Sequence, residues 1–166
     1  MRKLINQFKN FLTENRARKE DFDQGGSITL YHYSRPDAET LVLDPQHGAQ
    51  SYSRNDYIVS DVPRVFFYVD PADKERYFYG ANMFRVDVPS NQVYDLTADE
   101  QGYIDAARHP IYGLRNREEW NVLLEKIRED YGGVFYDTGS LKIVTWFSPI
   151  EVVRVPQEEQ AQLEGK

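Results

Sequence analysis

Apolar residues recur at helical spacing near the start of the chain, at positions 4, 5, 8, 11 and 12. Polar residues, including Lys3, Lys9 and Glu14, occupy the other side. This periodicity predicts an amphipathic helix from residue 3 to about residue 18, which Gly25-Gly26 separates from the rest of the chain. The helix either packs on the domain or serves as a docking arm for a protein partner.

Runs of alternating or β-forming residues predict strands after this helix. They cover residues 28–33, 64–69, 83–88, 92–96, 134–137, 142–147 and 150–155. Pro36 closes the first strand, because proline removes a backbone donor. Residues 44–62 scatter Pro, Gly, Ser, Asn and Asp among tyrosines and predict a long functional loop.

Helix-start signals occur at three places. Asp70-Pro71 has N-cap and first-turn chemistry for a helix through Ala81. Capping-box spacing at 97–100 and at 116–119 predicts two more helices, the second ending at Gly132-Gly133. The order of elements predicts an α+β fold with a helix over 1–24, a domain over 25–156 and an acidic, frayed tail over 157–166.

Composition narrows the function classes. A chain of 166 residues and 19.5 kDa fits one domain, and the lack of cysteine excludes disulfides and thiol chemistry. A net charge of −7 argues against a general phosphate-backbone binder. The apolar N-terminal stretch is broken by polar residues, so we expect a cytoplasmic protein with neither a signal peptide nor a membrane span.

The common cofactor motifs are absent. There is no dinucleotide fingerprint, P-loop, zincin helix or EF-hand loop. His47 and His109 have no carboxylates at ligand spacing, so we expect no metal site.

His32 is the candidate functional residue of the first strand. Imidazole can bind a ribose hydroxyl, while a flat aromatic ring stacks on a base or nicotinamide. Tyr31 and Tyr33 flank it on the opposite face of the strand, Ser34 and Arg35 follow at the strand end, and Tyr68 lies on a second aromatic strand. The simpler interpretation is a half-buried histidine satisfied by one backbone hydrogen bond.

Three motifs taken in order resemble the ADP-ribosyltransferase superfamily. They are TLYHYS at 29–34, RVFFYVD at 64–70 and GGVFYD at 132–137, the last followed by a VTWFSP strand. The chain looks most like the small, divergent members of phage polyvalent and head-morphogenesis proteins, and the likeness covers about residues 28–155. The resemblance implies a split, strongly bent β core that uses NAD as substrate and needs no metal.

The resemblance also implies roles for residues of this chain. The first-strand histidine of the family contacts the nicotinamide-side ribose, and an aromatic residue of the second motif stacks on nicotinamide. These roles fall to His32 and Tyr68, with Phe66 and Tyr79 as competing aromatics. The implied NAD-binding set is Tyr31, His32, Ser34, Arg35, Phe66, Tyr68 and Tyr79.

The catalytic carboxylate departs from the family pattern. Family members commonly place a glutamate at the start of a late strand, where it stabilises the oxocarbenium-like centre. Residues 140–143 contain no Glu, so Asp137 is the substitute; its other possible role is a turn cap over Gly139. Glu151 fits a solvated strand position.

Flanking residues have two interpretations each. Arg35 can pair with a pyrophosphate or with Asp37. Tyr52, Arg54 and Tyr57 of the long loop can close over a ligand or remain exposed without such a role.

Three functions follow from these observations. The first is an NAD-dependent ADP-ribosyltransferase, a glycosyltransferase-class enzyme that moves ADP-ribose to a protein or nucleic-acid acceptor. The second is a transferase-like module that binds a partner or nucleotide without turnover. The third is an acidic phage or bacterial interaction protein that occupies a basic site on a partner and inhibits it. The enzyme hypothesis gains most if His32 shares a cleft with Tyr68 and a carboxylate.

Overall fold

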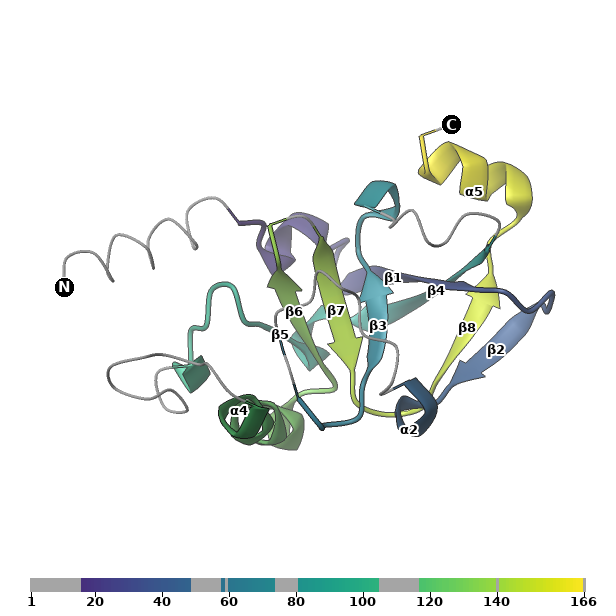
Figure 1. Ribbon diagram of the computed structural model, residues 1–166. Coiled ribbons are helices and arrows are strands. Elements are labelled where there is room, and N and C mark those ends of the chain that lie inside the picture. The colour runs from purple at the N-terminus through teal and green to yellow at the C-terminus, as the bar shows by residue number, and fades with distance from the viewer. Residues whose placement is uncertain are drawn as a thin grey trace.

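The computed structural model describes residues 16–48, 58, 60–73, 81–104, 117–139 and 141–165. Within these ranges the chain is a mixed α and β structure with eight strands in one sheet (Figure 1). Nearly all neighbouring strands are antiparallel; β5 and β6 run parallel. The sheet order is β2-β8-β4-β1-β3-β7-β6-β5.

The strand bounds agree closely with the predicted runs, and one strand was not predicted. They are β1 (Ser27–Ser34), β2 (Thr40–Leu43), β3 (Val65–Tyr68), β4 (Asn82–Pro89), β5 (Val93–Asp95), β6 (Gly133–Asp137), β7 (Lys142–Trp146) and β8 (Ile150–Arg154). The additional strand is β2, which pairs with β8 at one edge of the sheet. The predicted loop 44–62 contains the short helix α2 (Pro45–Gly48), and residues 49–57 and 59 lie outside the described part.

One junction holds the two halves of the sheet together. β1 and β4 pair along their full length, whereas β1 and β3 pair at a single position, Tyr31 opposite Tyr68. β3 continues the sheet through β7, β6 and β5, and β1 continues it through β4, β8 and β2. Figure 1 shows β1 and β4 crossing behind β3 at an angle to it, rather than lying alongside it.

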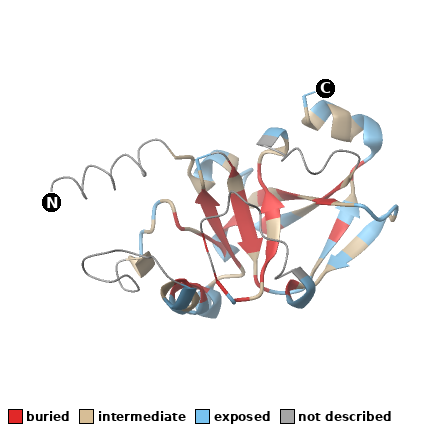
Figure 2. Cartoon of the chain, viewed as in Figure 1, coloured by how far each residue is buried: buried red, intermediate tan, exposed pale blue. Residues whose placement is uncertain are grey.

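The two faces of the sheet have separate apolar cores. The tyrosine face, which carries Tyr31, Tyr33, Tyr68 and Tyr136, packs against helix α4 (Arg117–Asp130). The phenylalanine face carries Phe67, Phe84 and Phe135 together with Ile28 and Leu30. The central strands β3, β7 and β6 are mostly buried, whereas β2, β8 and the C-terminal helix are largely exposed or half-buried (Figure 2).

Helix α4 begins and ends close to the predicted positions. Its buried residues Trp120, Leu123, Leu124 and Ile127 follow the i, i+3, i+4, i+7 spacing of one helical face. The chain after it turns through Gly132 into β6. Among the described residues no helix is long and apolar enough to cross a membrane.

Three helix predictions have different outcomes. The start of the helix predicted at Thr97 is wrong, because residues 96–98 form a turn and helical residues begin only at Tyr103 and Ile104, whose backbone N–H groups donate to Asp99. After Asp70 the chain forms the 3₁₀ helix η2 (Pro71–Asp73), and residues 74–80 lie outside the described part. The predicted N-terminal helix also lies outside it, except for residues 16–18, which are not helical.

The predicted frayed tail is wrong as well. Residues 157–163 form helix α5 (Gln157–Leu163). Gln160 accepts the N–H of Met83 and donates to the carbonyl of Ala81, so its amide continues the hydrogen bonding of β4. Glu159 pairs with Arg85 of the same strand. This polar, acidic helix thus docks on β4 through side-chain hydrogen bonds and an ion pair. The spacing of hydrophobic residues cannot predict such contacts.

The segment that precedes β1 is fixed by polar contacts with the sheet. The backbone N–H of Ala17 donates to Asp137, and that of Lys19 donates to Asp95. The ammonium group of Lys19 donates to the carbonyls of Ser90 and Val93. The 3₁₀ helices η1 (Lys19–Phe22) and η4 (Ser90–Gln92) flank these contacts, and Phe22 of η1 packs on Phe135 at a ring distance of 5.9 Å.

Trp146 of β7 packs tightly on the glycine pair that opens β6. A Cβ added to Gly133 would lie 2.7 Å from the Thr145 carbonyl oxygen and 2.7 Å from the Trp146 ring. Such distances are shorter than van der Waals contact, and a backbone oxygen within the ladder cannot move aside easily.

We predict that Gly133→Ala lowers the free energy of unfolding by about 1–3 kcal/mol, because the added methyl group overpacks the β6–β7 pair. Urea unfolding followed by tryptophan fluorescence measures the change. Wild-type stability in this variant would show that β6 and β7 separate without cost, contrary to the close packing described.

Candidate functional site

The candidate site is the junction between β1 and β3. Only Tyr31 and Tyr68 are paired there, so the backbone groups beyond that pair need other partners. The carbonyl of Phe66 finds one in a side chain: Nδ1 of His32 lies 2.9 Å from it. The imidazole therefore bridges the two strands where the ladder stops.

The His32 ring is held from two sides. Besides its bond to the Phe66 carbonyl, it contacts the ring of Phe67 edge-on, with centroids 5.6 Å apart. A carbonyl oxygen only accepts, so Nδ1 carries the proton and Nε2 carries the lone pair in the neutral ring. This tautomer presents a hydrogen-bond acceptor that suits a ligand hydroxyl.

Burial lowers the pKa of the His32 imidazole below its ordinary value of 6.5, and the hydrogen bond to the Phe66 carbonyl offsets part of that shift. The direction follows from desolvation, which disfavours the charged form. The ring is therefore neutral at neutral pH.

The tyrosines at the junction belong to the core. Tyr31 and Tyr68 are each 9% exposed, and Tyr33 packs edge-on against Tyr68 at 5.9 Å. Burial raises the pKa of Tyr33 far above its ordinary value, and the nearby carboxylate of Glu164 adds to the shift. Burial likewise raises the pKa of Tyr31. These rings hold the sheet together and offer little open surface for stacking.

His32 and Tyr68 do not face one another. Side chains alternate along β1, so Tyr31 and Tyr33 lie on one face and His32 points away from it. Tyr68 is directly opposite Tyr31 and shares its face, whereas His32 contacts Phe67 of the phenylalanine face. The expected shared cleft of His32 and Tyr68 is therefore not formed, because their register puts them on opposite sides.

Ser34 and Phe66 are half-buried near the same junction, and Arg35 is exposed just after β1. Asp37, the alternative partner of Arg35, pairs with Arg154 instead. Within the described ranges Arg35 has no ion pair, which leaves its guanidinium available to an anionic ligand.

Five residues named in the sequence analysis lie outside the described residues. They are Tyr52, Arg54, Tyr57, Tyr79 and His109.

Asp137 is buried at the end of β6, and both of its carboxylate oxygens are engaged. Oδ2 accepts the N–H of Ala17 at 2.8 Å, and Oδ1 accepts the N–H of Gly139 at 2.7 Å. The bond to Gly139 is the turn cap that the sequence analysis gave as the alternative role of Asp137. β6 lies three strands from β1 in the sheet order, and His32 bonds and packs against β3 and not β6. The structure does not bring Asp137 to His32.

Other carboxylates approach the tyrosine face from the C-terminal helix region. The Tyr33 hydroxyl donates to Glu164 at 3.4 Å, and Glu159 pairs with Arg85, which is opposite Tyr31. Sequence reasoning missed both because it treated residues 157–166 as a tail. Glu151 is exposed on β8, as expected for a solvated strand position.

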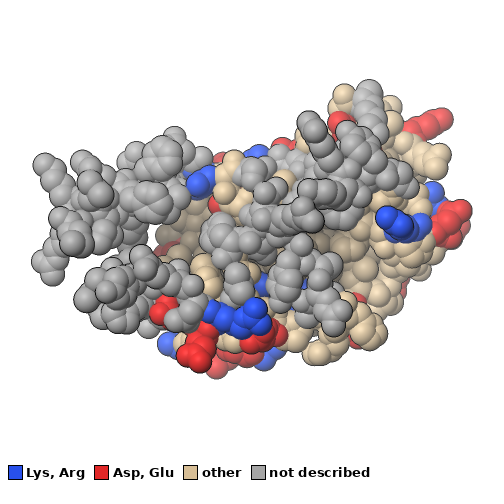
Figure 3. Space-filling view, viewed as in Figure 1, with Lys and Arg blue, Asp and Glu red and all other residues tan. Residues whose placement is uncertain are grey.

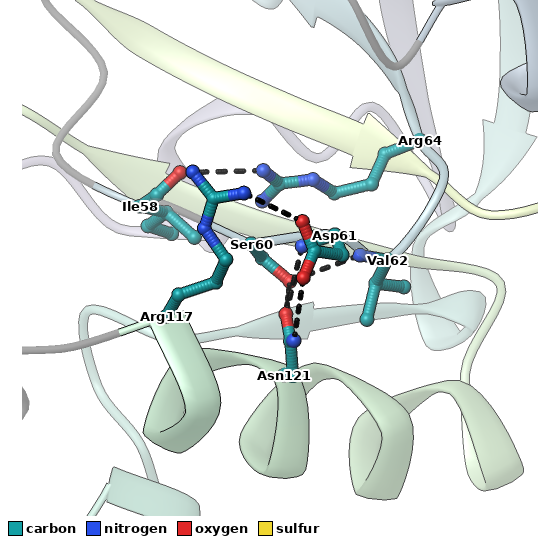
Figure 4. A network of polar contacts seen from close by, with 7 residues as sticks. All are labelled: Ile58, Ser60, Asp61, Val62, Arg64, Arg117 and Asn121. Carbon is teal, nitrogen blue, oxygen red and sulfur yellow. Dashed lines mark hydrogen bonds and ion pairs between the residues drawn. The ribbon is translucent and has the colours of Figure 1, made fainter.

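A second polar cluster lies between β3 and α4, and sequence reasoning missed it too (Figure 4). Asn121 of α4 accepts from the Ser60 hydroxyl at 2.5 Å and from the Asp61 N–H at 2.8 Å. Arg117 pairs with Asp61 at 2.8 Å, and the guanidinium of Arg64 donates to the Ile58 carbonyl at 3.3 Å. The available signal was a single arginine directly before the apolar run VFFY.

In the described part of the chain, a metal site would need several ligating side chains close together. No group of three or more His, Cys, Asp or Glu side chains is arranged there to hold an ion.

The lowered pKa of His32 predicts an acid-sensitive stability. The unfolded state takes up a proton near pH 6.5 and the folded state only at lower pH, so the stability associated with this ring is present above about pH 6.5 and falls as the pH drops toward the folded-state pKa. His32→Asn keeps an N–H donor near the Nδ1 position but does not titrate. We expect a smaller loss of stability in this variant than in wild type between about pH 7.5 and about pH 5.

Urea unfolding at several pH values measures the effect, and His47→Asn, at an exposed position on α2, is the matched control. Parallel acid loss in wild type and His32→Asn would contradict the assignment.

Comparison with known proteins gives no match to a family model, a curated protein or a solved structure.

Proposed function

We propose that this chain is an NAD-dependent ADP-ribosyltransferase that acts at the junction between β1 and β3. The observation that carries the proposal is the single-position pairing of these strands, with His32 bridging the point where they part. That arrangement supports the split, bent core that the sequence resemblance implies. NAD is the substrate, and the acceptor is a protein or nucleic acid.

His32 supplies the first contact of the proposed reaction. Its neutral ring carries a lone pair on Nε2, which accepts a hydrogen bond from a ribose hydroxyl of the bound NAD. The Phe66 carbonyl fixes the tautomer and the ring orientation. A positioned acceptor of this kind orients the ribose without first losing a proton at neutral pH.

Arg35 supplies a further contact. The exposed guanidinium of Arg35 fits the pyrophosphate, because its planar donors match phosphate oxygens. Phe66 is half-buried, but its ring lies on the tyrosine face with Tyr68, away from His32, so stacking of nicotinamide on either ring is not among the proposed contacts. In the transfer, the bond between ribose and nicotinamide breaks, nicotinamide leaves with the bonding electron pair, and an acceptor nucleophile forms the new bond to ribose.

A second function is favoured by the bonds of Asp137. Both oxygens of this carboxylate accept backbone N–H groups, so Asp137 stabilises the fold and is not placed to act in catalysis. A module that binds NAD without turning it over therefore accounts equally well for the junction. Release of nicotinamide separates the two functions.

The third hypothesis, an acidic inhibitor of a basic partner, lacks such an observation. On the side of the molecule in Figure 3, acidic side chains are interspersed with basic ones among the atoms it colours, and they form no continuous acidic surface.

We predict that His32→Ala weakens NAD binding about fivefold to tenfold, because one hydrogen bond to the ribose is worth about 1 kcal/mol. Isothermal titration calorimetry with NAD measures the affinity, and His47→Ala is the control because His47 is exposed on α2. Nicotinamide release, followed by chromatography, reports turnover. Unchanged affinity in His32→Ala, or the absence of NAD binding by wild type, would refute the proposal.

We also predict that Asp137→Ala lowers the free energy of unfolding by about 2–4 kcal/mol, since the N–H groups of Ala17 and Gly139 lose a charged acceptor. Urea unfolding measures this loss, with Glu151→Ala as the exposed carboxylate control. If Asp137→Ala instead keeps wild-type stability and abolishes nicotinamide release, Asp137 acts in catalysis and not as a clamp.

A further inference from the structure

Arg64 is a fully buried arginine without a counter-ion in the described chain. It directly precedes β3, is 1% exposed, and its guanidinium carbon lies 5.2 Å from the centre of the Phe66 ring. Its Nη2 donates to the Ile58 carbonyl at 3.3 Å. Its Nη1 has no hydrogen-bond partner among the described residues.

The nearest acidic residue in sequence, Asp61, is already used. Its carboxylate pairs with Arg117 at 2.8 Å and accepts from the Asn121 amide at 3.2 Å (Figure 4). It is also largely exposed, whereas Arg64 is not. The Asp61 carboxylate therefore neutralises the partly exposed guanidinium and not the buried one.

A second buried donor lies close by on the same face of the sheet. Thr145 of β7 is 0% exposed, and its Oγ1 has no partner among the described residues. Thr145 is directly opposite Phe66 in the β3–β7 register, and Phe66 lies under the Arg64 guanidinium. Side chains alternate between the two faces of a strand, so Arg64, two residues before Phe66, lies on the same face as Phe66 and its partner Thr145. The two unpartnered donors thus occupy neighbouring rows of the tyrosine face.

The chemistry of this pair favours one ligand class. Buried arginine is rarely left unpaired, because its charge loses hydration without compensation. Guanidinium is a donor only, and the Thr145 hydroxyl can also donate, so both atoms are satisfied by a group that accepts several hydrogen bonds and carries negative charge. Carboxylate and phosphate oxygens meet that description and match the planar fork of arginine.

We propose that Arg64 and Thr145 form an oxyanion-binding site for a carboxylate or phosphate group between β3, β7, Ile58 and residues 60–62. The site is next to the junction, because the Phe66 carbonyl that bonds His32 belongs to the residue whose ring underlies Arg64. The site does not depend on NAD being the substrate, since small anions alone test it.

The test is thermal unfolding of the full chain in increasing sodium phosphate or sodium acetate, at constant ionic strength adjusted with sodium chloride. We expect the Tm of wild type to rise by several degrees with at least one of these anions, because a ligand that binds only the folded state stabilises it. A rise with phosphate alone identifies a phosphoryl group as the preferred ligand, and a rise with both identifies oxyanions in general.

Two variants test the residues. Arg64→Met replaces the guanidinium with an apolar chain and is expected to unfold at or above the wild-type Tm in chloride while losing the anion response. Thr145→Val removes the unpartnered hydroxyl without changing the shape of the side chain, and we expect it to reduce the response. Arg128→Met is the control, since Arg128 is an exposed arginine of α4, and it keeps the full response.

Three results would overturn the site. They are an unchanged wild-type Tm in both anions, an undiminished anion response in both Arg64→Met and Thr145→Val, and loss of the response in Arg128→Met. The NAD proposal fails separately, through titration of NAD with the His32 variants, so either proposal can fail while the other holds.

Discussion

The fold depends on the one position where β1 and β3 pair. Among the described residues, Tyr31 and Tyr68 are the one pair in register between β1 and β3, so side chains must supply the remaining contact across this joint. Tyr33 packs on Tyr68 across this joint, and the tyrosine face continues into the core beneath α4. Large rings suit this role, because each buries much apolar area without needing a regular ladder. Their burial therefore supplies stabilisation at a joint where the backbone pairing is short.

The same constraint explains the environment of His32. Where a ladder stops inside a protein, a carbonyl must find another donor or lose a hydrogen bond. The imidazole supplies that donor to Phe66 and is thereby fixed in tautomer and orientation. The simpler interpretation of the sequence, one backbone bond in a half-buried strand histidine, is thus correct in its geometry. It does not exclude a functional role, since a ring bound through Nδ1 keeps its second nitrogen for a ligand.

The local spacing of hydrophobic residues predicted most strands and helix α4 well, because the alternation of a strand and the 3.6-residue period of a helix appear among residues close in sequence. It failed where partners are distant. Asp137 is held by the N–H of Ala17, 120 residues away in the chain. Helix α5 docks through Gln160 and Glu159 and has no apolar stripe to reveal it. The relative faces of His32 and Tyr68 depend on a cross-strand register that neither strand specifies alone.

Phe66 connects the two polar features of this region, the His32 imidazole and the buried Arg64 guanidinium. Its carbonyl accepts from His32 on one side of the junction, and its ring lies beneath the guanidinium of Arg64 on the other. A shift of this residue changes the orientation of the imidazole and the support of the buried charge together. Because β3 is anchored to β7 along its whole length but to β1 at one point, movement at the joint is easier on the His32 side. The ligand proposed for His32 and the anion proposed for Arg64 would therefore act on the same short strand, the first through the Phe66 backbone and the second through the Phe66 side chain.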